Sequence, residues 1–493
     1  MSADLARILP EVVLTLGIVA VLMVDLLWKS AASRRGALAA SALAATVGAL
    51  VALVARSGDA GTAFSGMLAL DGFATFFRAF VLVVAVYGVW LGATSDEIPE
   101  SRLGEFLLLL LCLTLGLAFL ASARNLLMIY LAIELVSIPS YILAGFRRGD
   151  RRSSEAALKY VIYGAGASGL MLYGFSLIYG LTGSLDLAAI GGILPVSSTE
   201  FGTSLTVAAA AILSLAGFGY KVAAVPFHMW CPDVYEGAPT PFVAFLSVGP
   251  KAAGLAALIR FLTVAFPTPE IFGLAARHFP WALVIGVLAI ATMTLGNVVA
   301  IAQDNVKRLL AYSSIAHAGY LLMGVAVASP ESIRAVMMYL GVYLAMNLGA
   351  FGAVLAVRHV TGYETIGAYK GLGARSPLLA VLLAIFLFSL TGVPPFGGFI
   401  GKFYLFASVL HAGTPFFYAL AIVGVLNTAV SLYAYARVLK AMYFESLPGV
   451  EPPRPLTFAH GAMLVSLAIP TLVLGIWWSS LIEAIKRSSA IIP

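Results

Sequence analysis

Charged residues are scarce in this sequence. They make up 11% of its 493 residues, whereas hydrophobic residues make up 61%. An ordinary soluble domain carries about 25% charged residues. The composition therefore excludes a soluble fold and predicts an all-α polytopic membrane protein. The net charge of +6 is assigned to arginines in the expected loops, and it does not indicate a nucleic-acid partner.

Cysteine is almost absent as well. Cys112 and Cys231 are the two cysteines, and neither belongs to a spacing that ligates zinc or an iron–sulfur cluster. The literal G-x-G-x-x-G at 164–169 follows no strand and lies inside an apolar stretch, so we interpret it as helix packing. Residues 396–403 fail the phosphate-loop pattern. We therefore expect no cofactor, no metal and no redox centre in this chain.

Long apolar stretches are the main feature of the sequence. A spanning helix needs about 20 mostly apolar residues, and fourteen stretches qualify. The first is expected to be helix 1, because 1–9 lacks the basic region of a removable signal sequence. The stretches are 10–28, 37–55, 72–93, 104–121, 125–146, 156–181, 204–229, 240–266, 280–301, 308–328, 333–357, 377–411 (broken), 416–443 and 458–482.

The distribution of lysine and arginine predicts the orientation of these helices. Connections after odd-numbered helices are richer in both residues, with Arg147, Arg148, Arg151 and Arg152 clustered in one of them. Positive loops stay in the cytoplasm. We therefore expect a multi-pass protein of the bacterial inner membrane with both termini on the periplasmic side.

A weak internal repeat runs through the middle of the chain. Tyr160 precedes Thr182 by 22 residues and Tyr339 precedes Thr361 by 22, an offset of 179. Asn125 and Asn305, and likewise Lys221 and Lys402, recur at 180 and 181 residues, which gives one register for helices 4–8 against helices 9–13. Five helices are an odd number, so the second copy should be inverted relative to the first. The expected divisions are 1–100 (helices 1–3), 101–266 (first repeat), 267–445 (second repeat) and 446–493 (helix 14).

Four ionisable residues lie deep in the apolar stretches. They are Glu134 in helix 5, Lys221 in helix 7, Lys251 in helix 8 and Lys402 in helix 12. A lysine at membrane depth costs roughly 2.5–3.5 kcal/mol on insertion scales, and such residues usually face the bundle interior and pair. We expect Glu134 to pair with Lys221. A desolvated lysine releases its proton more readily, so a row of lysines joined by hydroxyls, imidazole and water would relay protons across the membrane midplane.

Prolines interrupt two of the lysine-bearing helices. Pro226 follows Lys221, and Pro394 with Pro395 precedes Lys402. Such breaks free backbone groups that lipid cannot satisfy, and broken helices in corresponding halves indicate a transport site. The competing interpretation is that the buried charges are structural ion pairs. Excess positive charge in each half argues against it, because an unpaired buried charge is costly.

Several polar side chains near the lysines could complete a relay. His317 lies mid-helix between lysines in sequence, and it could be either a relay group or a packing residue. His228 is expected at the end of broken helix 7, near the surface, with a possible role in an access path. Tyr312, Ser313 and Ser314 could supply hydroxyl bridges, although polar residues also simply link helices.

Three segments carry a resemblance to a known family. They resemble the antiporter-like membrane subunits of respiratory complex I, the NADH–quinone oxidoreductase, and the similarity spans nearly the whole chain. Within that family the chain is similar to the N type, because it ends after helix 14, has lysine in helix 12 and contains Asp233-Val-Tyr-Glu-Gly-Ala-Pro239. The segments are Pro226-Phe-His-Met-Trp-Cys-Pro-Asp-Val-Tyr-Glu-Gly-Ala-Pro239-Thr-Pro, Lys307-Arg-Leu-Leu-Ala-Tyr-Ser-Ser-Ile-Ala-His317-Ala-Gly-Tyr and Gly392-Val-Pro-Pro-Phe-Gly-Gly-Phe-Ile-Gly-Lys402-Phe.

The resemblance implies a subunit of a proton translocase. Glu134, Lys221, Lys251 and Lys402 match the family's helix 5 glutamate and the lysines of helices 7, 8 and 12, with His317 as a further relay group. Quinone reduction elsewhere in the complex would drive the protons. FMN, iron–sulfur clusters and quinone are expected in partner subunits, and the neighbours would be the M-type chain, small A-, J- and K-type subunits, and lipids. Alternatives with the same lysine chain are a subunit of a Mrp-type cation/proton antiporter and one of an energy-converting hydrogenase.

Overall fold

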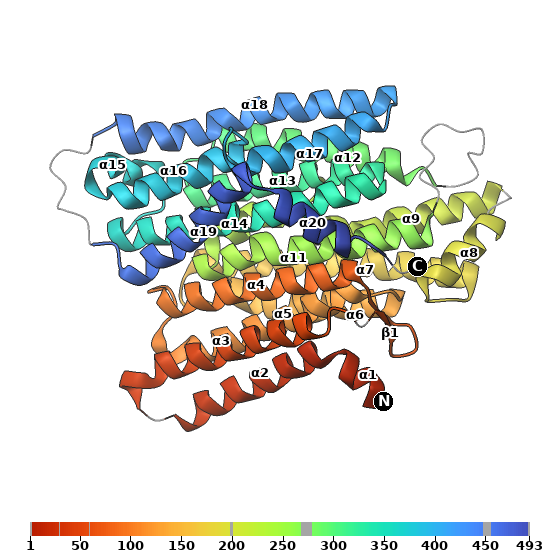
Figure 1. Ribbon diagram of the computed structural model, residues 1–493, viewed down its shortest axis with the longest axis horizontal. Coiled ribbons are helices and arrows are strands. Elements are labelled where there is room, and N and C mark those ends of the chain that lie inside the picture. The colour runs from red at the N-terminus through yellow and green to blue at the C-terminus, as the bar shows by residue number, and fades with distance from the viewer. Residues whose placement is uncertain are drawn as a thin grey trace.

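The protein folds into a bundle of long, nearly parallel helices (Figure 1). The computed structural model describes residues 2–28, 30–58, 60–197, 201–267, 279–446 and 455–491. Within these ranges thirteen helices are long and apolar enough to cross a membrane, which confirms the all-helical membrane fold. They are α2 (Leu9–Leu27), α3 (Ala31–Ala55), α4 (Gly72–Thr94), α5 (Leu103–Ser122), α6 (Leu126–Ala144), α7 (Arg151–Thr182), α9 (Phe201–Val222), α11 (Thr240–Arg260), α12 (Trp281–Ile301), α13 (Val306–Val327), α14 (Pro330–Thr361), α18 (Pro415–Phe444) and α19 (Phe458–Ile476).

The fourteenth span is a helix in two pieces. α16 (Pro377–Thr391) and α17 (Gly397–His411) have 15 residues each, too few to cross a bilayer singly. Together they occupy the predicted broken helix 12. The predicted break in helix 7 is also present, because α9 stops at Val222 and α10 (Trp230–Gly237) follows after seven non-helical residues.

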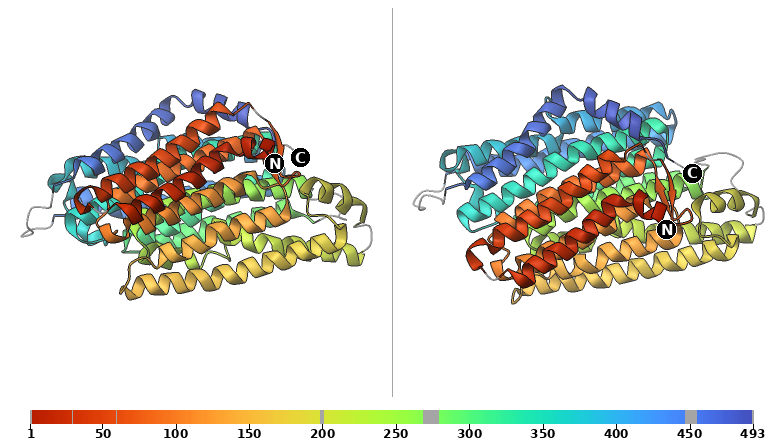
Figure 2. Two further views of the ribbon diagram at one scale, coloured as in Figure 1. Left: turned by 90° about the horizontal axis from the view of Figure 1, so that it is seen from below. Right: turned by 60° about the horizontal axis from the view of Figure 1, so that its bottom comes forward.

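Three helices form the centre of the bundle. In α11 the whole of the most apolar window is buried, and in α13 and α14 89% of it is buried, whereas α18 at one edge reaches 33%. Figure 1 places α2 and α3 at the opposite edge from α18. Both chain ends lie at the same end of the bundle in Figure 2, as an even number of crossings requires.

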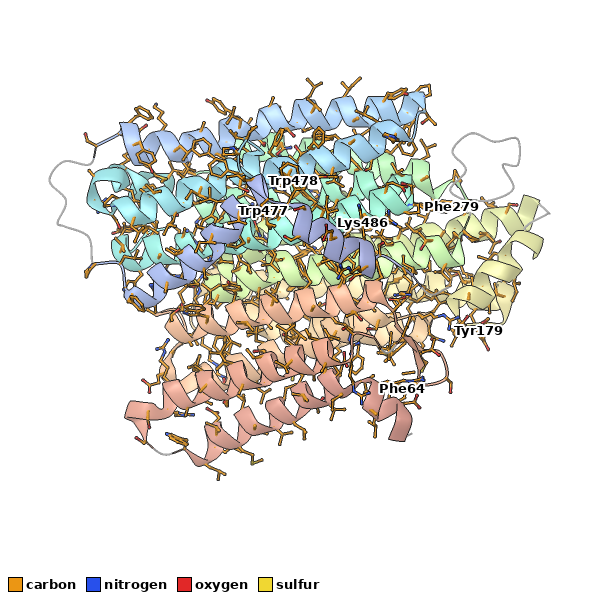
Figure 3. The ribbon with its side chains drawn as sticks, in the orientation of Figure 1. Phe64, Tyr179, Phe279, Trp477, Trp478 and Lys486 are labelled. Atoms are coloured by element: carbon orange, nitrogen blue, oxygen red, sulfur yellow. The ribbon has the colours of Figure 1, made fainter. Side chains whose placement is uncertain are left out.

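Short elements complete the chain. Trp478 and Lys486 belong to the last segment, which crosses the bundle surface (Figure 3). The predicted helix 14 over 458–482 is too long, because Trp477 leaves helical geometry and α20 starts anew. The other elements are α1 (Ser2–Arg7), α8 (Leu187–Ser197), α15 (Leu372–Arg375), α20 (Ser479–Ser488), the antiparallel strands β1 (Gly61–Ala63) and β2 (Leu68–Leu70), the 3₁₀ turns Glu100–Arg102 and Ile366–Tyr369, and a π turn at Phe261–Ala265.

Matching local features recur about 180 residues apart. Asn125 caps α6 and forms an isolated β-bridge with Asp186, while Asn305 caps α13 and bridges Thr365. α7 and α14 both have 32 residues and end at a left-handed glycine. Five spans separate the two bridges, so the bridges lie at opposite ends of the bundle, where Figure 1 shows β1 and α15. The inversion of the complete five-helix units stays a prediction.

Candidate proton-relay site

Lys221 lies where α9 ends and is 2% exposed. Its Nζ donates to Ser137 Oγ of α6 at 3.0 Å. Its alkyl chain packs against α11 at Gly254, where an added Cβ would come within 3.0 Å of Lys221 Cγ. The absence of a side chain at Gly254 thus lets Lys221 approach the helix that carries Lys251.

Glu134 lies one turn before Ser137 on the same helix. Its charge acts on Lys221 through space, but no ion pair within 4.0 Å joins the two among the described residues. One carboxylate oxygen of Glu134 is buried without a hydrogen-bond partner in that part of the chain. The expected Glu134–Lys221 pair is therefore separated, and Lys221 donates its hydrogen bond to the Ser137 hydroxyl instead.

In the break beside Lys221, side chains form hydrogen bonds with backbone groups that have no helical partner. The N–H of Val225 donates to Thr292 Oγ1 at 3.0 Å, and the carbonyl of Tyr220 accepts from Trp230 Nε1 at 3.2 Å. The peptide bond before Pro226 is cis. The two hydrogen bonds, from Val225 to Thr292 and from Trp230 to Tyr220, let the chain leave helical geometry inside the bundle, away from lipid.

His228 lies within this break and is buried, not near the surface. It is 6% exposed, and its Nδ1 has no hydrogen-bond partner among the described residues. The prediction was wrong because it placed the end of helix 7 at His228, whereas α10 continues the chain beyond the break. Asp233 of α10 is held by Lys159 at 2.6 Å and by Arg308 at 2.5 Å.

Lys251 occupies the middle of α11, after Pro250, and is 2% exposed. Its Nζ donates to the carbonyl oxygen and the Oγ of Ser314 at 2.7 and 2.6 Å. Ser314 Oγ also accepts from the hydroxyl of Tyr343 at 2.9 Å. The predicted hydroxyl bridge at Ser314 is therefore in place beside the amine.

His317 follows Ser314 by one turn of α13. Its Nδ1 is hydrogen-bonded to the hydroxyl of Tyr339, and its ring centroid lies 5.2 Å from that of Tyr343 and 5.8 Å from that of Tyr320. The side chain is 2% exposed. An imidazole in this position links the Lys251 hydroxyl cluster to the aromatic groups around the next lysine.

Lys402 lies in α17 and is 3% exposed. Its Nζ donates to the carbonyls of Leu390 and Thr391 at 3.2 and 2.9 Å, and it lies 4.6 Å from the ring centroid of Tyr320. These carbonyls end α16, where the break at Pro394 and Pro395 leaves them without helical partners. No carboxylate of the described residues lies within 4.0 Å of the amine.

Two predicted hydroxyls lie outside this line. Ser313 bonds to Tyr435 at 2.5 Å, and the ring of Tyr312 lies under Arg308 at 6.0 Å. The sequence analysis in turn missed Ser137, Tyr320, Tyr339 and Tyr343. The i, i+4 spacing of the last two on one helix face was the available signal.

An ion-pair cluster lies at the bundle end formed by the predicted cytoplasmic loops. The Glu97 carboxylate accepts from the backbone N–H of Thr240 at 2.9 Å and lies 2.7 Å from Arg358 Nη1. Lys307 Nζ lies 3.6 Å from Glu364. Burial acts to raise the pKa of Glu97, but the charges of Lys307 and Arg358 outweigh it and leave that pKa lowered. The described residues contain no group of three or more histidine, cysteine or acidic side chains suited to a metal ion.

Comparison with known proteins places the chain in a family. Residues 123–428 match the family model described as "NADH:quinone oxidoreductase/Mrp antiporter, TM". NADH-quinone oxidoreductase subunit N of Anaeromyxobacter sp. (strain Fw109-5) is 48% identical, over 97% of this chain and 95% of the relative. A chain of respiratory complex I from Thermus thermophilus, solved with bound aureothin, is 33% identical with a TM-score of 0.80, over 97% of this chain and 99% of that chain.

A more distant structure has the same fold. A chain of the Mrp complex from Dietzia sp. superposes with a TM-score of 0.83 over 98% of this chain and 97% of that chain, at 23% identity. The fold alone therefore does not separate complex I subunits from Mrp subunits, whereas sequence identity does. The chain belongs to the NADH:quinone oxidoreductase/Mrp antiporter family of membrane proteins.

Proposed function

We propose that this chain translocates protons as a membrane-arm subunit of an NADH–quinone oxidoreductase, with Glu134, Lys221, Lys251, His317 and Lys402 as its relay. The observation that carries the proposal is the environment of the Lys251 and Lys402 amines. Lys251 and Lys402 are buried, yet each is held by hydroxyl or carbonyl oxygens and not by a carboxylate. Charges that only locked helices together would be paired with opposite charges.

The relay works through neutral and protonated amines. Lys251, in its charged form, passes a proton to Ser314. Tyr343 donates to Ser314 in this structure, so the two hydroxyls must first turn for Ser314 to pass a proton on to Tyr343. His317 accepts next, since the unprotonated nitrogen of a neutral imidazole can bind a proton. Lys402, which lies beside the ring of Tyr320, then receives the proton from His317. Movement of Glu134 toward or away from Lys221 changes how firmly that first amine holds its own proton.

The rest of the complex would supply the energy. We expect quinone reduction in partner subunits that carry FMN, iron–sulfur clusters and quinone. The expected neighbours are an M-type chain and small A-, J- and K-type subunits in the bacterial inner membrane, with both termini periplasmic. The 48% identity with a subunit N relative supports this assignment over a Mrp-type antiporter, whose structural match is 23% identical.

The test removes one amine by a substitution that preserves the fold. Lys251→Met keeps the alkyl chain and removes the proton-binding group. In inverted membrane vesicles we expect NADH-driven proton uptake and coupled quinone reduction to fall together, by about 100-fold for a lost proton-transfer group. Lys440→Met, at a lysine that is 69% exposed, is the matched control. Full pumping by assembled Lys251→Met complex would show that the chain is a static anchor.

A further inference from the structure

The Lys402 amine lies over the face of an aromatic ring. Its Nζ is 4.6 Å from the ring centroid of Tyr320, which is inside the distance of about 6 Å at which a ring attracts a cation. An ammonium group has three donors, and the carbonyls of Leu390 and Thr391 accept two of them. No other oxygen of the described residues accepts from this amine. The ring of Tyr320 is therefore available to the third donor.

The other two relay lysines lack such a ring. Lys221 donates to the hydroxyl of Ser137, and Lys251 donates to the carbonyl and hydroxyl of Ser314. Within the described part of the chain, the remaining contacts between a cation and a ring face belong to arginines at the ends of helices. The contact with an aromatic face thus distinguishes Lys402 from the lysines of the first half.

The ring of Tyr320 is fixed by groups from neighbouring helices. Asn297 of α12 donates its Nδ2–H to the Tyr320 hydroxyl at 3.2 Å, and Thr428 Oγ1 of α18 lies 3.4 Å from the same oxygen. Phe406 of α17 meets the ring nearly edge-on, with centroids 6.4 Å apart and an interplanar angle of 82°. Tyr320 itself is 1% exposed. Side chains of α12, α17 and α18, which lie around α13 in Figure 1, therefore hold the ring over the amine.

The alkyl chain of Lys402 is confined as well. Gly392 ends α16 in the left-handed region, with φ at 89°. A Cβ added to Gly392 would come within 2.9 Å of Lys402 Cδ. The lysine can reach the end of α16 because this position has no side chain. Two backbone carbonyls and a fixed ring thus define one location for the amine.

We propose that Tyr320 is a positioning residue whose ring face stabilises the charged form of Lys402, so that the amine holds its proton at this point of the membrane. This inference rests on the proposed relay function. The electron-rich face of a ring attracts an ammonium group but gains little from a neutral amine. No bond to the ring forms or breaks. The arriving proton binds the free electron pair of the neutral Lys402 amine, and it leaves from the same atom.

Fluorination of the ring separates this electrostatic role from packing. Phenylalanine placed at position 320 with zero, two or three ring fluorines keeps the shape of the ring, while each fluorine withdraws electron density from its face. In inverted membrane vesicles, we expect NADH-driven proton uptake per assembled complex to fall stepwise, by about tenfold across the series. The same series at Phe386, which is buried in α16, is the control and should leave the rate unchanged. A rate at position 320 that does not follow the number of fluorines would overturn the inference.

Ordinary substitutions provide a second measurement. Tyr320→Phe removes the hydroxyl and keeps the ring against Phe406, so it should retain most of the proton uptake. Tyr320→Leu removes the ring face and should lose about tenfold. Equal losses in both variants would show that the hydroxyl matters instead of the ring, and would also overturn the inference. Loss of pumping in Lys251→Met beside a flat fluorine series would leave the proposed function intact and remove the role of Tyr320, whereas full pumping in Lys251→Met would remove both.

Discussion

Neutralising Glu97 should destabilise the protein in a pH-dependent way. Glu97→Gln keeps the shape and can still accept from the Thr240 N–H, but it leaves Arg358 and the fully buried Lys307 with less counter-charge. Breaking a buried pair costs about 3–5 kcal/mol. Arg358 is 27% exposed and has a second carboxylate, Glu364, at 3.3 Å, so we expect a loss below that range, of about 2 kcal/mol.

The sign of the pH dependence follows from the lowered pKa of Glu97. A carboxyl whose pKa is lower in the folded protein stabilises it fully above the ordinary value of 4.5, and this contribution is lost as the pH falls through the folded-state pKa. The stability gap between the unaltered chain and Glu97→Gln should thus be largest at neutral pH and shrink below about pH 4.5.

The assay is the fraction of a tagged chain that stays soluble when the detergent-solubilised complex is heated. It is measured at pH 7 and pH 4. Glu100→Gln, on the same loop but exposed, is the control and should melt with the unaltered chain at both pH values. A gap of equal size at pH 7 and pH 4, or no gap at pH 7, would refute the electrostatic reasoning.

Three further predictions concern other parts of the bundle. Lys402→Met should abolish NADH-driven proton uptake in vesicles that still contain assembled complex; uptake at the normal rate would remove Lys402 from the relay. Ser137→Ala should slow uptake about tenfold, because it removes the acceptor at 3.0 Å from Lys221 Nζ, and an unchanged rate would show that this hydroxyl is dispensable. Arg78→Ala should cost about 3–5 kcal/mol and reduce the assembled complex on native gels, since it leaves Glu11 buried without its two bonds of 2.8 and 2.6 Å. The double variant Glu11→Leu with Arg78→Met should recover assembly, and failure to do so would indicate a role beyond charge pairing.

The spans and the lysines were predictable from sequence because lipid imposes strict rules. A bilayer requires long apolar helices, so the fourteen stretches correspond to helical spans whose ends differ by up to seven residues from the predicted bounds. A lysine in such a stretch must be accommodated inside the bundle, which is where Lys221, Lys251 and Lys402 lie.

The hydroxyl groups around the lysines were harder to predict. A tyrosine or serine in an apolar helix costs little, so Tyr339, Tyr343 and Ser137 look like packing residues until three-dimensional neighbours are known. Contacts across helices far apart in sequence decide their role, as between Lys251 and Ser314. The depth of His228 was misjudged because the sequence did not indicate that a further helix, α10, follows the break.

The position of Lys402 at the end of α16 has a consequence for how each half of the molecule supports its amine. The aligned peptide dipoles of a helix amount to roughly half a negative charge at its C-terminus. That partial charge belongs to the backbone, so it stays in place as long as α16 is folded. The charge that acts on Lys221 belongs instead to the Glu134 side chain, which makes no direct ion pair with the amine. One half of the molecule thus supports its amine with fixed backbone groups, and the other half supports it with a side chain whose rotamer can change.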